Sequence, residues 1–250
     1  KDILQTYYEL HSDGNNESEI FTSKVISKLA DEISNHLPKI QKDDKYNQAR
    51  KLVEIRLSNV WNRMDEESKK FLITAKFLFL ENMNLENSID YSSICLLSSK
   101  ALEVELSKRI VSSYQKYLNE KGLDLKNWPS SMVHTYKKGE RIFTEKLDPK
   151  IFSLGSTPYI MGILGKPGEK EKNKEMFLQF CKENLMESKS DDEISKSLQK
   201  IDKYIQYIKD NFRNPAAHKE TMSITDATNC LDYVLEAEKA LRDILECFNY

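Results

Sequence analysis

The chain has 250 residues, enough to bury a core as one large domain or two small ones. It has only 7 Gly and 6 Pro, and it is rich in Lys, Glu, Leu, Ile and Ser, which favours helices over a turn-rich β fold. The net charge of −2 argues against a broad, sequence-blind nucleic-acid groove, although a small local RNA site stays possible. No apolar run approaches the roughly 20 residues that cross a bilayer, so no membrane association is expected.

The cysteines give no sign of a metal or disulfide site. They lie far apart, with no C-x-x-C pair and no Cys/His cluster, at Cys95, Cys181, Cys230 and Cys247. Each is predicted to be a small buried hydrophobic residue, and no metal or other cofactor is expected. No signal-peptide pattern is seen, which predicts a cytoplasmic location. The start at Lys1 instead of Met suggests an excised piece or an incompletely ordered N-terminus.

Residues 1–64 are predicted to be an N-terminal helical extension. Apolar residues recur at helical spacing between Phe21 and Ile33. A second helix is expected from about Gln48 to Trp61, with its inward face at Val53, Leu57, Val60 and Trp61. No chemistry is identifiable here, so packing or partner binding is the expected role.

Residues 65–250 are predicted to form one helical domain. Two strongly apolar helices, Ser68–Met83 and Ser88–Leu118, are expected in its core, and Gly122 is a plausible terminator of the second. Prolines and glycines mark an irregular insertion at about 123–168, with one short apolar element beginning at Phe152. A helix at about Glu171–Leu185 should follow.

Two capping boxes predict the starts of the last two long helices. In a capping box, the side chain of the first residue accepts from the backbone N–H three residues later, and the side chain of that later residue accepts from the backbone N–H of the first. They are Ser190 with Glu193 and Ser223 with Asp226. The apolar stripe of the first helix continues to Phe212. The expected stripe of the final helix is Ala227, Leu231, Val234, Leu241, Leu245 and Phe248.

The segment between these helices combines a helix breaker with residues suited to phosphate chemistry. Pro215 should end the first helix near Arg213, so that Asn214 caps a new short helix. On an unbroken helix, Arg213 and His218 would point about 140° apart. The predicted break would let them meet at one concave spot, with His218 near a helix N-terminus. Arginine binds phosphate oxygens and histidine transfers protons near neutrality, although a structural role at a helix end is an equally ordinary explanation.

The sequence Arg213-Asn214-Pro215-Ala216-Ala217-His218 resembles the Arg-x(4–6)-His signature of HEPN domains, which carry a polar residue directly after the Arg. Its place between the last two long helices also fits, and the resemblance covers roughly 65–250. It implies an HEPN-like four-helix bundle with metal-independent endoribonuclease activity, as in toxin and antiviral (phage) defence systems. His218 would transfer protons around the 2′-hydroxyl, Arg213 would neutralise the phosphorane, and Asn214 would position the scissile phosphate or the histidine.

The resemblance also implies partners, and at one position the chain differs from some members of the family. Such sites are usually composite, so a homodimer or a second HEPN domain is expected, within a larger polypeptide or defence complex. Some HEPN toxins carry a Tyr two residues after the motif His, where this chain has Glu220, so regulation through such a tyrosine is not supported. The alternative is a non-catalytic HEPN-like module for dimerisation or nucleic-acid binding, and a further one is a plain helical adaptor in which the motif is a coincidence.

Weaker candidates lie outside the motif. Glu103 and Glu105 on the long second helix are possible supporting acids, although a solvated helix face is expected for at least one of them. His134 and Tyr136 lie in the region predicted to be irregular. They could contact RNA or simply belong to an exposed loop, and the exposed loop is the favoured interpretation. Residues that would bind the rest of the substrate are not identifiable.

Overall fold

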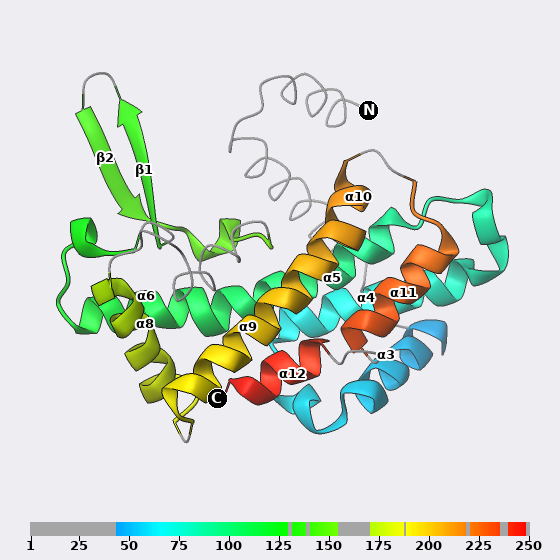
Figure 1. Ribbon diagram of the computed structural model, residues 1–250. Coiled ribbons are helices and arrows are strands. Elements are labelled where there is room, and N and C mark those ends of the chain that lie inside the picture. The colour runs from blue at the N-terminus through cyan, green and yellow to red at the C-terminus, as the bar shows by residue number, and fades with distance from the viewer. Residues whose placement is uncertain are drawn as a thin grey trace.

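The computed structural model describes residues 44–129, 132–138, 141–154, 171–187, 189–218, 221–235 and 240–248. These residues are mostly helical, which confirms the all-α prediction apart from one β-hairpin (Figure 1). The helix predicted between Phe21 and Ile33 lies outside the described part. Among the helices described, none combines the length and the apolar character that crossing a membrane requires.

Most of the helices are joined by short turns. The α-helices are α3 (Asp44–Leu57), α4 (Glu66–Asn82), α5 (Ser92–Leu106), α6 (Ser113–Glu120), α8 (Glu171–Asn184), α9 (Asp191–Ile208), α10 (Asn214–Ala217), α11 (Ile224–Leu235) and α12 (Ala240–Cys247). Two π-helical turns interrupt long helices, at Ser107–Ser112 and Lys209–Arg213. Short 3-10 helices lie at Ser58–Arg63, Met83–Ser88, Leu125–Asn127 and Pro149–Ile151.

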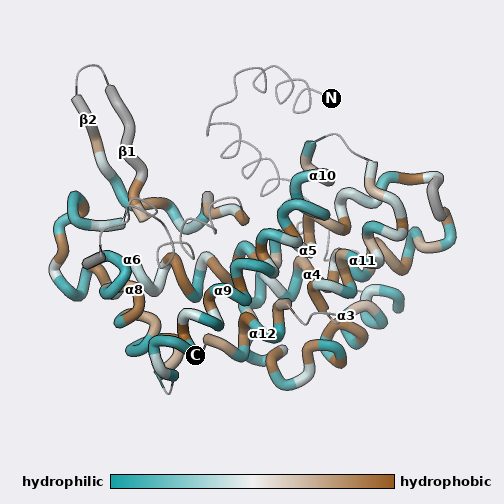
Figure 2. Tube along the Cα trace, in the orientation of Figure 1, coloured by the Kyte–Doolittle hydropathy of each residue, from teal (hydrophilic) through white to brown (hydrophobic). Residues whose placement is uncertain are grey.

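One hydrophobic core unites the helices. Helix α4 packs along α5, α3 covers α4, and α11 lies against α5. The buried apolar residues of these helices belong to one core cluster, and hydrophobic residues recur along each of the helices (Figure 2). The inward residues predicted for the second helix are all buried: Val53, Leu57, Val60 and Trp61. The Arg63 guanidinium also donates to the Phe248 carbonyl oxygen at 2.6 Å. The described part of the predicted N-terminal extension therefore belongs to the same core as the rest.

Helix α5, the π turn Ser107–Ser112 and α6 follow without a break from Ser92 to Glu120, close to the single long helix predicted (Figure 1). This helix ends at Glu120, just before Gly122 as expected. Gly122 adopts φ +66°, a conformation that glycine adopts without the steric cost that a Cβ would add. The Leu123 N–H then donates back to the Leu118 carbonyl at 3.3 Å. Helices α5 and α6 thus follow one another across the π turn, and both contribute buried residues to the core.

An antiparallel hairpin, β1 (Val133–Lys138) and β2 (Arg141–Lys146), lies where an irregular insertion was predicted. For these residues the prediction was wrong. Their β-branched and aromatic residues favour a pleated strand, and Tyr136 pairs with Phe143 across the ladder. The short spacing and Gly139 between the two runs are a hairpin signal that outweighs a general reading of glycine as a loop marker.

Candidate functional site

The motif segment sits on a helix that continues through it. After α9 ends at Ile208, the π turn leads directly into α10, and both Arg213 (φ −69°, ψ −50°) and Asn214 (φ −70°, ψ −47°) keep right-handed helical geometry. The predicted helix end at Arg213 and the Asn214 cap were wrong. A π turn uses i→i+5 bonds, and this widening accommodates a proline that an ordinary α turn would exclude. The Asn214 side chain accepts a hydrogen bond from Arg213 Nη1 at 3.0 Å instead.

His218 lies at the C-terminal end of α10. Its backbone N–H donates to the carbonyls of Asn214 at 2.9 Å and Pro215 at 3.2 Å, while its side chain is exposed. The prediction that it would lie near a helix N-terminus was therefore wrong, because Pro215 does not start a separate helix. The negative end of the helix dipole attracts cations and does not help to bind phosphate.

Arg213 occupies the opposite kind of environment. It is only 1% exposed, and it is the largest fully buried side chain in the described part of the chain. Its Nε lies 3.9 Å from Glu103 Oε1 on α5. Nε and Nη2 have no hydrogen-bond partner among the residues that the structure describes. An incompletely satisfied guanidinium in the core is costly, and such a group commonly marks a functional or ion-binding position.

Glu103 is the centre of a small buried ion cluster. It is 3% exposed, its Oε1 accepts from the Leu154 N–H at 3.0 Å, and its Oε2 accepts from Lys100 Nζ at 3.2 Å. Lys100 is itself 5% exposed. Arg213, Glu103 and Lys100, which we call the buried ion cluster, thus join the motif to helix α5.

A second buried carboxylate lies two residues further along α5. Glu105 is 1% exposed, and it accepts from the Asp65 N–H at 2.8 Å and from Arg109 Nε at 2.7 Å. The prediction that at least one of Glu103 and Glu105 faces solvent was wrong. Each carboxylate receives a backbone N–H and a cation, and these partners offset the cost of removing it from water.

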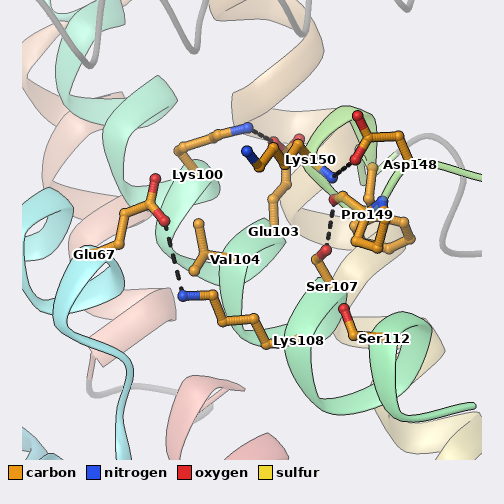
Figure 3. A pocket seen from close by; sticks show the side chains of 11 residues that line it. Glu67, Lys100, Glu103, Val104, Ser107, Lys108, Ser112, Asp148, Pro149 and Lys150 are labelled. Atoms are coloured by element: carbon orange, nitrogen blue, oxygen red, sulfur yellow. Dashed lines mark hydrogen bonds and ion pairs between the residues drawn. The ribbon is translucent and has the colours of Figure 1, made fainter. Parts of the chain in front are cut away.

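An open cavity of about 600 Å³ adjoins the buried ion cluster (Figure 3). Lys100 and Glu103 form part of its wall, together with residues of the π turn Ser107–Ser112 and of the 3-10 turn Pro149–Ile151. Sequence reasoning missed Lys100. The signal was available, because a lysine three residues before Glu103 interrupts a stretch of small and apolar residues on a core helix.

Among the predicted site residues, Arg213 thus contacts both Asn214 and Glu103. His218 is exposed at the end of the same helix. His134 and Tyr136 lie on β1, away from the helical turn that carries the motif (Figure 1). Within the described ranges, no group of three His, Cys, Asp or Glu residues is placed to hold a metal ion.

Comparisons of the chain with protein-family models, with curated proteins and with solved structures find no match.

Proposed function

We propose that this protein is a metal-independent endoribonuclease of HEPN type. The observation that carries the proposal is a buried, incompletely satisfied arginine at the end of a π turn, followed by an exposed histidine at the end of the next short helix. Both residues belong to the sequence that resembles the HEPN signature. A π turn, such as the one that ends at Arg213 and precedes His218, is a feature often found at functional sites.

In the proposed reaction, His218 takes the proton of the RNA 2′-hydroxyl, and the 2′-oxygen attacks the adjacent phosphorus. The bond from phosphorus to the 5′-oxygen breaks, the leaving oxygen takes up a proton from water, and His218 releases its proton to solvent, so that no net proton is consumed. The products are a 2′,3′-cyclic phosphate and a 5′-hydroxyl. Arg213 stabilises the additional negative charge of the phosphorane. The hydrogen bond from Arg213 Nη1 to Asn214 supports a role for Asn214 in orienting the guanidinium.

The burial of Arg213 sets a condition on this mechanism. Direct contact between its guanidinium and a phosphate requires displacement of the side chains that cover it. The proposed composite site, in a homodimer or with a second HEPN domain, supplies a reason for such a rearrangement. In this proposal the chain is a toxin or antiviral defence effector that acts within a larger polypeptide or complex, and RNA is its substrate.

The same burial favours a second candidate function, a non-catalytic HEPN-like module for dimerisation or nucleic-acid binding. In that case Arg213 ties the turn of α9 and α10 to α5 through Glu103, at 3.9 Å, and the motif is structural. His218, whose side chain is exposed, is not part of this ion pair. The two candidates therefore differ most in what His218 contributes.

The test is RNA cleavage by the purified protein in EDTA, with the ends of the products identified. The endoribonuclease proposal expects cleavage in chelator, cyclic phosphate ends, and a loss of about 10²–10⁴-fold in the His218→Ala variant. Activity that disappears in EDTA and returns with one divalent ion would reject the mechanism. A wild-type protein that binds RNA without cutting it would favour the non-catalytic module.

A further inference from the structure

The cavity beside the buried ion cluster has the size of a ligand site. Its volume of about 600 Å³ lies within the range of small-molecule sites, roughly 300–1,000 Å³. Helices α4 and α5 form one side, and the 3-10 turn Pro149–Ile151 forms the other (Figure 3). The cavity is reached from solvent, yet Lys100 and Glu103 in its wall are almost completely buried.

The buried ion cluster lacks one negative charge. Arg213 and Lys100 carry two positive charges, and Glu103 supplies one negative charge, so the sum is one positive charge at 5% exposure or less. Glu103 provides the one ion pair that the structure describes for each of these cations. A buried charge without a counterion is strongly unfavourable. An anion beside Lys100 would neutralise the cluster and release Glu103 to pair more fully with Arg213.

The wall of the cavity adds a further cation. Lys150 extends into the same part of the cavity as Lys100 (Figure 3), and its ammonium has no ion-pair partner among the described residues. Two further carboxylates of the wall keep their negative charge, and each contacts a group other than the Lys100 and Lys150 ammonium groups. Asp148 accepts the backbone N–H of Lys150 at 2.9 Å, and Glu67 lies 3.9 Å from the ammonium of Lys108.

The chemistry of the wall suits a phosphate better than a base. Its apolar members, Val104, Pro149 and Phe152, offer no open aromatic face, since Phe152 is 2% exposed. Base recognition usually uses stacking on such a face, whereas lysine ammonium groups bind phosphate as point charges.

We propose that this cavity is a subsite for a phosphate of the RNA strand next to the scissile phosphate, held by Lys100 and Lys150. This inference rests on the proposed function, because it takes RNA as the ligand. Glu103 contacts Lys100 and Arg213, so the subsite and the motif share one carboxylate. Binding of the flanking phosphate would therefore act directly on the charge balance around Arg213.

The test measures binding of a fluorescently labelled single-stranded RNA to the His218→Ala protein by anisotropy, in the absence of cleavage. Adding Lys150→Ala should weaken binding about tenfold and reduce the slope of log affinity against log salt by about one. Lys100→Gln should weaken binding at least as much. Lys126→Ala, an exposed lysine outside the cavity, is the matched control and should bind like its parent. Equal affinity for Lys150→Ala and the control would overturn the subsite.

Competition with inorganic phosphate tests whether the cavity binds a phosphate of RNA or a free phosphate ion. Millimolar phosphate should displace RNA from the Lys150-containing protein more readily than from Lys150→Ala. Phosphate binding that depends on Lys150 but leaves RNA affinity unchanged would overturn the RNA assignment. A wild-type protein that does not cleave RNA, but binds it through Lys150, would refute the endoribonuclease and leave the subsite standing.

Discussion

Replacing Arg213 and His218 separately with Ala should affect stability very differently. Arg213 is 1% exposed and paired with Glu103, whereas the His218 side chain is exposed. Truncating a large buried side chain to Ala typically costs about 2–5 kcal/mol, because it leaves a cavity. Glu103 keeps the Lys100 ammonium and the Leu154 N–H, so its own charge stays compensated, and we expect a cost of about 3 kcal/mol. His218→Ala should stay within about 0.5 kcal/mol, as exposed substitutions usually do.

Thermal denaturation followed by circular dichroism measures this difference. For a chain of this size, 1 kcal/mol corresponds to roughly 2–4 °C in Tm, so Arg213→Ala should melt about 6–12 °C lower and His218→Ala within about 2 °C of wild type. Adding Glu103→Gln to Arg213→Ala should cost less than the sum of the two single changes, because the two residues interact. Equal melting temperatures for the two alanine variants, or strictly additive effects in the double variant, would refute the buried ion cluster.

Three further predictions concern other parts of the molecule. Ser190→Ala removes the cap of α9 and should cost about 1 kcal/mol in urea denaturation, with an unchanged m-value. Burial raises the pKa of Asp65, but the hydrogen bonds from Lys108 and from the backbone N–H of Glu67 outweigh it, so the pKa is lowered overall. The ionised Asp65 should therefore stabilise the fold above about pH 4, and this stabilisation should be lost as the pH falls through the lowered pKa. Asp65→Asn should abolish this part of the acid transition. Burial raises the pKa of Cys181 to about 12, so mass spectrometry after iodoacetamide treatment at pH 8 should show modification of at most the partly exposed Cys247 until the protein is unfolded.

Periodicity predicted most of the helices, because burial of one face leaves a regular trace in the sequence. The final stripe from Ala227 to Phe248 is buried at every predicted position, and both capping boxes form, with Ser190 accepting from the Glu193 N–H and Ser223 from the Asp226 N–H. These are local or single-face patterns, and they do not depend on which other element supplies the neighbours.

The candidate site was less predictable, because its geometry depends on contacts between distant residues. A single sequence does not tell that Glu103 and Arg213, 110 positions apart, lie within 3.9 Å. The local rule for Pro215 predicted a helix break, and the π turn provided another solution. Charged residues such as Lys100 are also expected at the surface unless a partner is known, and the partner is specified only by the fold.

The two π turns have a consequence for the angular phase of the side chains. In an α-helix each residue advances by about 100°, so one residue more or less in a turn rotates everything after it relative to everything before it. The turn Lys209–Arg213 sets the phase of Arg213 and His218 relative to the buried face of α9. Deleting one of its exposed residues, such as Asn211, should leave the motif facing nearly as it does now if the turn reverts to α geometry, because a π turn holds about one residue more than an α turn. The same deletion within the regular α geometry of α9 would instead rotate the motif by about 100°. The π turn therefore takes up one residue of helix length while the direction of the motif is kept.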